Sequence, residues 1–211
     1  KQRLLAQLGL AECFILKEQY LQAINLLEVI VGKHINFRAA AQKLIGDSYL
    51  YQGQFEKAIA SYKRVVEFAP ADSLSNDALD RIVLLESNSD YSNVPLEGYV
   101  DALRASLTGR SDDALKIWRM TIEEYPDSLI VDDAWLMVGQ VCRSEQAHNQ
   151  AIQAYEQVVN QKKIVAPEAL AEIAEIYSGE LRDIKKALET YRVLIRDYSD
   201  SVIVPYARQK V

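Results

Sequence analysis

Cysteine and histidine, the side chains that most often bind transition metals, are few and widely spaced in this sequence. The chain contains two of each, Cys13 and Cys142 with His34 and His148. A zinc site needs about four such ligands at short, characteristic spacings, and these two separated pairs do not supply them. We therefore expect no metal site and no bound cofactor.

Carboxylates are abundant, but their spacing does not favour catalysis. Two adjacent pairs, Asp112-Asp113 and Asp132-Asp133, stand at predicted helix starts. Neighbouring residues on a helix point in different directions, so neither pair forms an acid–base couple. At a helix N-terminus a carboxylate instead accepts hydrogen bonds from free backbone N–H groups. The sequence also lacks the G-x-S-x-G, P-loop and Rossmann glycine motifs, and we expect residues 1–211 to be non-enzymatic.

The composition is that of an acidic, folded protein. Of the 211 residues 49% are hydrophobic and 26% charged, and the net charge is −6. Binding to nucleic acid or to an anionic membrane surface needs a basic stripe, and none is visible. No segment approaches the roughly 20 apolar residues of a membrane span. We therefore expect the partner to be another protein or peptide, with no nucleic acid and no direct membrane insertion.

The strongest signal in the sequence is a short pattern that recurs five times. Each copy has Ala, then Ile or Leu, and then Leu, Tyr or Trp four positions after the Ala. The five alanines are separated by 35, 56, 37 and 36 residues. A period in this range is typical of stacked helical repeats. The copies begin at Ala23, Ala58, Ala114, Ala151 and Ala187, and their fifth residues are Leu27, Tyr62, Trp118, Tyr155 and Tyr191.

These copies resemble the tetratricopeptide repeat (TPR), a unit of two antiparallel helices. The second copy matches best, with Gly46, Tyr49, Gly53, Phe55, Ala58, Tyr62 and Pro70. In such a unit small residues let the two helices approach closely, and aromatic residues fill the space between neighbouring units. The resemblance implies an all-α, right-handed superhelical solenoid of antiparallel helix pairs. In a solenoid Cys13 and Cys142, more than three repeats apart, are too distant for a disulfide.

About twelve helices account for the chain. The 56-residue spacing leaves room for one orphaned helix, 74–87, followed by a polar loop at 87–93. We expect an N-terminal lobe, 1–87, and a C-terminal lobe, 94–211, within one continuous solenoid. The predicted helices are 3–17, 20–32, 37–51, 55–68, 74–87, 96–108, 111–124, 129–145, 148–160, 167–179, 184–197 and 202–210.

The first predicted helix, LLAQLGLAECFIL, is apolar on nearly all sides. Such a helix favours neighbours on both faces, so we expect the chain to be a fragment of a longer array with further repeats before Lys1. A signal peptide fits less well, because Glu12 precedes Cys13 where a lipoprotein cleavage box has a small residue. The junctions EEYPDS and EFAPADS resemble those of bacterial TPR proteins of the cell envelope. That resemblance favours the periplasm, and the two unpaired cysteines are equally compatible with the cytoplasm.

The resemblance also implies where a partner would bind. In TPR arrays the first helix of each pair lines a concave surface that holds peptides, and we expect Tyr51 and Tyr99 to anchor a partner there. The clamp with which some family members hold a chaperone's C-terminal carboxylate is not expected, because Asp47 stands one turn after Lys43 where Asn would be needed. The predicted groove residues are Lys43, Asp47, Tyr51, Tyr99, Leu103, Gln140, Arg143, Glu172 and Glu175.

The function that these observations favour is a non-catalytic scaffold or adaptor that binds a partner segment on the concave surface. Two alternatives stay open. The chain could self-associate into a homo-oligomer through its apolar N-terminal face, or it could position or regulate an enzyme domain elsewhere in the full-length protein.

Overall fold

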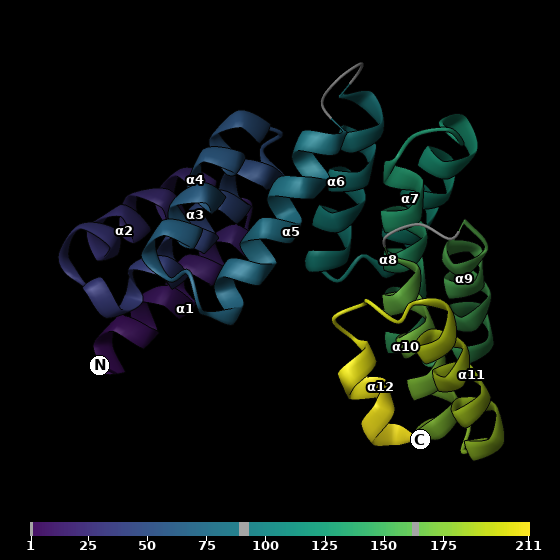
Figure 1. The fold of residues 1–211 in the computed structure, drawn as a ribbon. Helices are drawn as coiled ribbons and strands as arrows, with labels where there is room; N and C mark the ends of the chain where they lie inside the picture. The colour runs from purple at the N-terminus through teal and green to yellow at the C-terminus, as the bar shows by residue number, and fades with distance from the viewer. Residues whose placement is uncertain (1, 89–92, 162–164) are drawn as a thin grey trace. The chain divides into compact units, whose positions relative to one another are not determined.

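The structure is a computed structural model that describes residues 2–88, 93–161 and 165–211 (Figure 1). Within these ranges it has twelve α-helices, one short 3-10 helix and no strand. Every predicted helix is present and each end lies within two residues of its predicted position, so the prediction of an all-α fold is confirmed. The helices are α1 (Gln2–Leu16), α2 (Tyr20–Lys33), α3 (Arg38–Tyr51), α4 (Phe55–Phe68), α5 (Ser73–Ser87), α6 (Val94–Leu107), α7 (Ser111–Glu124), α8 (Ile130–Ser144), α9 (His148–Gln161), α10 (Ala166–Ser178), α11 (Ile184–Asp197) and α12 (Val204–Lys210).

The chain forms two compact units, unit 1 (Lys1–Ile117) and unit 2 (Trp118–Val211). Their boundary falls within α7. The sequence-based division places the boundary at the polar loop 87–93, of which residues 89–92 lie outside the described part of the chain. The two predicted lobes and the single continuous solenoid therefore remain predictions.

Consecutive helices pack against one another in both units (Figure 1). In unit 1, α1 packs on α2 and α3 on α4, and the two pairs are joined by contacts between α2 and α3. The next helix, α5, packs on α4. In unit 2, α8 packs on α9 and α10 on α11, with α9 against α10 and α12 against α11. This nearest-neighbour packing is what a stack of helix pairs produces.

A residue with positive φ marks the turn inside each pair. Glycine holds this position in two turns, Gly53 with φ of 69° and Gly109 with φ of 77°. The other three turns place Glu18, Gln146 and Arg182 there, with φ of 58°, 61° and 54°. A left-handed conformation reverses the chain directly after a helix, and glycine adopts it at no steric cost. These turns identify five pairs, α1/α2, α3/α4, α6/α7, α8/α9 and α10/α11, and leave α5 outside them.

Close approach within two of the pairs depends on a glycine that faces a tyrosine. A Cβ atom added to Gly46 in α3 would lie 2.6 Å from the ring of Tyr62 in α4. Gly139 in α8 faces Tyr155 in α9 in the same way, and a Cβ there would also overlap the ring. Both tyrosines are fully buried. The small and aromatic positions of the repeat pattern are thus complementary surfaces of one helix pair.

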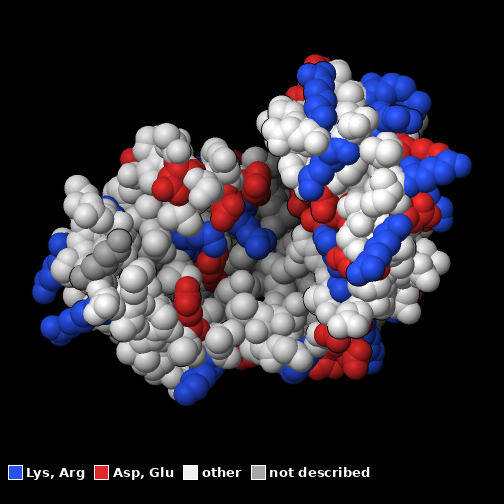
Figure 2. Space-filling view, turned by 90° about the horizontal axis from the view of Figure 1, so that it is seen from below, with Lys and Arg blue, Asp and Glu red and all other residues white. Residues whose placement is uncertain are grey.

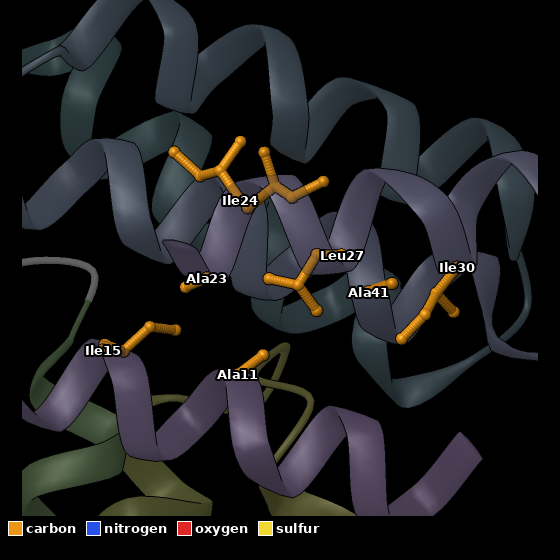
Figure 3. Close-up of a cluster of buried hydrophobic side chains, with 8 residues drawn as sticks. Ala11, Ile15, Ala23, Ile24, Leu27, Ile30 and Ala41 are labelled. Carbon is orange, nitrogen blue, oxygen red and sulfur yellow. The ribbon is translucent and has the colours of Figure 1, made fainter. Parts of the chain in front are cut away.

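The cluster of fully buried side chains shared by α1, α2 and α3 is aliphatic (Figure 3). Ala11 and Ile15 of α1 face Ala23 and Leu27 of α2, and all four are buried. The opposite side of α1 is exposed, since Leu5, Leu10 and Leu16 keep 51%, 47% and 47% of their surface. The apolar first helix therefore buries only one face within this chain.

The predicted capping of helix N-termini by aspartate is found at α5 and α11 and not at α8. Asp72 caps α5 by accepting a hydrogen bond from the Leu74 N–H at 2.9 Å, and Asp183 caps α11 by accepting one from the Lys186 N–H at 3.1 Å. The prediction that Asp132-Asp133 caps a helix is corrected. The N-cap residue of α8 is Leu129, and no side chain caps this helix by a hydrogen bond. Asp132 and Asp133 lie in the first turn, where negative charges interact favourably with the helix dipole.

Candidate functional site

The predicted groove residues divide between the two units. In unit 1, α3 contributes Lys43, Asp47 and Tyr51, and α6 contributes Tyr99 and Leu103. In unit 2, α8 contributes Gln140 and Arg143, and α10 contributes Glu172 and Glu175. All nine lie on the first helix of a pair, as the repeat register predicts.

Asp47 is held on both sides by its own helix pair. Its Oδ2 lies 3.2 Å from Lys43 Nζ, one turn earlier in α3. Its Oδ1 accepts a 2.8 Å hydrogen bond from the hydroxyl of Tyr62 in α4. The side chains of Lys43 and Asp47 retain 25% and 14% of their surface. Asp47 is therefore a fixed, partly shielded charge whose two oxygens both have partners.

Tyr99 and Leu103 are not surface residues. They keep only 3% and 6% of their area, because α6 lies against α3. The expectation that Tyr99 anchors a partner from the groove surface is corrected by this burial. Of the two predicted anchors, Tyr51 alone keeps partial exposure.

Arg81 in α5 joins this group and was not predicted from the sequence. Its charge acts on the buried or half-buried groups Asp47, Tyr51, Tyr62 and Tyr99, which come from three other helices. Burial would lower the pKa of the Arg81 guanidinium, but these four neighbours raise it. Burial, followed by the charge of Asp47, raises the pKa of Tyr51 to about 12. We call Lys43, Asp47, Tyr51, Tyr62 and Arg81 the unit 1 polar cluster.

A second arginine supports the edge of this cluster. Arg104 in α6 donates a hydrogen bond to the Tyr51 carbonyl oxygen at 3.3 Å and pairs with Asp101 at 2.7 Å. The ring of Tyr51 lies 6.5 Å from that of Tyr20 in α2, centroid to centroid. Helices α2, α3 and α6 therefore meet around Tyr51.

Unit 2 carries a more strongly paired set of charges. The guanidinium of Arg143 in α8 lies 2.6 Å from Glu172 in α10 and 2.7 Å from Glu180 in the turn that follows α10. One side chain of α8 is therefore paired with both carboxylates. The arginine and both carboxylates keep about a third of their surface. Burial would lower the pKa of Arg143, and its bonds to Glu180 and Glu172 raise it.

Glu175 is covered by the last helix. It accepts hydrogen bonds from the hydroxyls of Tyr191 in α11, at 2.6 Å, and Tyr206 in α12. Lys210 of α12 lies 3.3 Å from the same carboxylate oxygen. Burial would raise the pKa of Glu175, but these three donors lower it. Residues Arg143, Glu172, Glu175, Glu180, Tyr191, Tyr206 and Lys210 form the unit 2 polar cluster.

One arrangement is common to both clusters. The repeat tyrosine of the second helix donates to a carboxylate of the first helix, Tyr62 to Asp47 and Tyr191 to Glu175. In the α8/α9 pair, 15 positions before Tyr155, the place of Asp47 is taken by Gln140. The Tyr155 hydroxyl is buried and has no hydrogen-bond partner among the residues that the structure describes. Asp47 and Glu175 therefore stabilise the packing of their own helix pairs.

A shallow groove of about 480 Å³ lies elsewhere on unit 2, between α7, α8 and α9. Trp135 contributes an aromatic side chain, Arg119 and Glu156 contribute opposite charges, and Gln150, Gln153 and Gln157 contribute amides.

Charges of both signs are interspersed on the face shown in Figure 2, where no large area carries one sign alone. Among the residues whose positions are described, no group of three or more His, Cys, Asp or Glu side chains is arranged to hold a metal ion. Cys13 is exposed, Cys142 is buried, and both are free thiols. None of the described helices is long and apolar enough to cross a membrane.

The sequence was compared with known families and structures. Models of the tetratricopeptide repeat match residues 39–72, 101–128, 132–163 and 168–201. No curated protein matches the sequence. Solved structures with a similar fold include nearly identical TPR-like repeats from Podosopora anserina (17% identity, 94% of this chain and 98% of that one, TM-score 0.44).

Two further structures are similar at the same level. The TPR2AB domain of yeast Sti1, solved with pHSP90, is 15% identical over 97% of this chain and 81% of that one, with a TM-score of 0.47. The MamA protein is 23% identical over 79% of this chain and 98% of that one, with a TM-score of 0.39. The four matched segments cover the pairs α3/α4, α6/α7, α8/α9 and α10/α11. The chain therefore belongs to the tetratricopeptide repeat family.

Proposed function

We propose that this chain is a non-catalytic scaffold that binds an extended segment of another protein along the inner sides of its first helices. The observation that carries the proposal is the ordered polar surface of α3, where Lys43, Asp47 and Tyr51 are partly exposed. Lys43 is paired with Asp47 of the same helix, Asp47 also accepts from Tyr62 of α4, and the ring of Tyr51 lies beside that of Tyr20 in α2. A surface whose side chains are already ordered loses little conformational entropy on binding. The paired charges of Arg143 with Glu172 and Glu180 provide a second ordered surface in unit 2.

Site-specific photo-crosslinking tests this proposal. A photoreactive amino acid is placed at Lys43 or Gln140, both partly exposed on first helices. The matched controls carry it at Glu67 or Glu189, exposed positions on the second helices α4 and α11. After irradiation in native cells, we expect partner crosslinks from positions 43 and 140. Crosslinks only from positions 67 and 189 would contradict the proposed surface.

Self-association is the second candidate, because α1 exposes three large apolar side chains, Leu5, Leu10 and Leu16. Exposed apolar surface is a common feature of protein interfaces. Light scattering on the native protein and on a Leu5→Ser/Leu16→Ser variant separates the two functions. A mass that falls to that of a monomer in the variant supports self-association, and a monomer in both rules it out.

For localisation we propose the periplasm or cell envelope, on the basis of the junction sequences EEYPDS and EFAPADS. Fractionation of the native host with an antibody against this chain tests the proposal. Recovery in the cytoplasmic fraction alone would contradict it.

A further inference from the structure

We propose that the groove between α7, α8 and α9 in unit 2 binds a proline-rich segment of a partner protein in the polyproline II conformation. We call this site the Trp135 groove. It is separate from the proposed scaffold surface, because none of the nine residues predicted to bind a partner lines it. Its polar lining residues are Arg119, Trp135, Gln150, Gln153, Glu156 and Gln157.

The Trp135 groove has a floor that is fixed by helix packing. Its volume is about 480 Å³, within the range of roughly 300–1,000 Å³ that is typical of ligand sites. Val138 of α8 and Ala154 of α9 line it and keep only 1% and 2% of their surface. Trp135 is half-buried beside them. An aromatic residue that is already held in place loses little conformational entropy when a ligand packs on it.

Most polar groups of the Trp135 groove have no partner within the described part of the chain. The Gln150 Oε1 atom accepts a weak hydrogen bond from Cys142 Sγ at 4.0 Å. Among the residues that the structure describes, the other five polar lining side chains make no hydrogen bond and no ion pair. The carboxylates Asp47 and Glu175, in contrast, are held by tyrosines of their own helix pairs. The groove therefore offers its polar groups to a ligand.

Donors outnumber acceptors among these groups. The guanidinium of Arg119, the indole N–H of Trp135 and the three glutamine amides can all donate. The acceptors are the Glu156 carboxylate and the amide oxygens of the glutamines, of which that of Gln150 is already engaged. A complementary ligand has many carbonyl groups and few N–H groups. An ordinary peptide brings one N–H for each carbonyl, whereas a proline residue brings a carbonyl and no N–H.

The charge and the aromatic side chain point to the same kind of ligand. Arg119 and Glu156 carry opposite charges, so the lining as a whole is neutral and favours an uncharged segment. Trp135 provides a flat apolar surface on which a pyrrolidine ring can pack. Aromatic grooves bind proline-rich segments in this way, and such segments are already extended before they bind.

The spacing of the glutamines matches the repeat of a polyproline II helix. Gln150 and Gln157 are seven residues apart on α9, which is roughly 10 Å along the helix axis. Gln153 lies between them on the same side of the helix, at spacings of three and four residues. A polyproline II helix presents the same side every three residues, or roughly every 9 Å. Carbonyl groups on one side of a bound segment can therefore reach successive glutamines.

An NMR titration of the whole chain with decaproline, acetylated and amidated at its ends, tests the inference. The chain has two tryptophans, Trp118 fully buried and Trp135 half-buried, and Trp135→Phe assigns their indole N–H signals. We expect decaproline to shift the Trp135 signal and to leave that of Trp118 nearly unchanged. The matched probes are capped decaserine, which has a backbone N–H at every residue and no ring, and maltotriose, which offers hydroxyl groups only. Neither should shift the Trp135 signal.

Fluorescence anisotropy of labelled decaproline then measures the affinity of variants. Gln153→Ala/Gln157→Ala removes two exposed donors, and we expect it to weaken binding about tenfold. The matched control is Gln22→Ala/Gln209→Ala, at exposed positions of α2 and α12, and should bind as the native chain does. Trp135→Phe keeps a ring and loses the indole N–H, so its binding should also weaken. Circular dichroism checks that each variant folds, and the glutamine variant decides if Trp135→Phe does not.

A Trp135 signal that decaproline does not move would overturn the inference. So would equal decaproline binding by the native chain and Gln153→Ala/Gln157→Ala. An equal or larger shift with decaserine or with maltotriose would reject the preference for proline, in favour of a general peptide site or a carbohydrate site. The photo-crosslinks from positions 43 and 140 test a different surface, since neither residue lines the Trp135 groove. Failure of one proposal therefore leaves the other standing.

Discussion

The Tyr62 hydroxyl in α4 donates a hydrogen bond to Asp47 Oδ1 in α3 across 2.8 Å. We expect Tyr62→Phe to lower the free energy of unfolding by roughly 1–3 kcal/mol, because the ring packing is kept while a partly buried carboxylate loses a donor. Urea unfolding followed by circular dichroism measures this. The matched control is Tyr155→Phe, since the Tyr155 hydroxyl is buried without a hydrogen-bond partner in the described part of the chain. Its removal should be neutral or stabilising. Equal losses in both variants would contradict the assigned role of Asp47.

Gly46 and Gly139 are required by close packing. Replacing Gly46 by Ala places a Cβ 2.6 Å from the Tyr62 ring. We expect Gly46→Ala and Gly139→Ala each to destabilise the fold by about 1–3 kcal/mol through overpacking. The control is Gly9→Ala in α1, where an added Cβ meets nothing within 4 Å. Alanine there should stabilise by about 0.5–1 kcal/mol through its higher helix propensity. Thermal unfolding of the three variants distinguishes packing from propensity, and a destabilised Gly9→Ala would refute this distinction.

Glu175 makes stability depend on acidic pH. Its pKa is lowered in the fold by the hydrogen bonds of Tyr191, Tyr206 and Lys210, despite the opposing effect of burial. A carboxyl with a lowered folded pKa contributes stability above its ordinary pKa of 4.5, and this contribution is lost as the pH falls below that value and through the folded pKa. In Glu175→Gln the contribution is absent at every pH.

The difference in unfolding free energy between the native chain and Glu175→Gln should therefore be largest at neutral pH and shrink below about pH 4.5. Urea titrations at several pH values measure it. Glu189→Gln, at an exposed position of α11, serves as the control and should show a smaller effect. A difference that is the same at all pH values would refute the role of the charged form.

Arg143 and Glu172 form the closest ion pair of the unit 2 polar cluster, at 2.6 Å and with about a third of each side chain exposed. A double-mutant cycle with Arg143→Ala and Glu172→Ala should give a coupling energy of roughly 0.5–1 kcal/mol, reduced by high salt. The comparison pair is Lys63–Glu86 in unit 1, where more than half of each side chain is exposed. Its coupling should be smaller because water screens it. A larger coupling for the exposed pair would contradict this account.

The helices could be predicted because the information for them is local. Apolar residues at helical spacing, the recurring Ala-Ile/Leu pattern and the turn glycines place each helix within two residues, including the additional helix α5. Gly46 with Tyr62 and Gly139 with Tyr155 could be paired for the same reason, since each pair lies within one short two-helix unit.

The candidate site was only partly predictable. The repeat register places Lys43, Asp47, Tyr51 and Arg143 on first helices, as observed. It does not reveal that Tyr99 is buried or that Arg81 approaches Asp47 from α5. An arginine on an amphipathic helix is, in sequence, one of many surface charges, and no spacing rule distinguishes it.

The sequence alone therefore determined which segments are helical and how they pair, because helix periodicity and small-to-aromatic packing act over fewer than about 40 residues. The tertiary structure decided which polar side chains of the first helices are already paired within the chain. Glu175 is covered by Tyr206, 31 positions later, and Arg143 is paired with Glu172 and Glu180, 29 and 37 positions later. Asp47 is paired with Lys43 of its own helix and with Tyr62, 15 positions later. Such outcomes depend on which helix faces meet and at what distance, and a short hydrogen bond requires a precision that a repeat pattern does not encode.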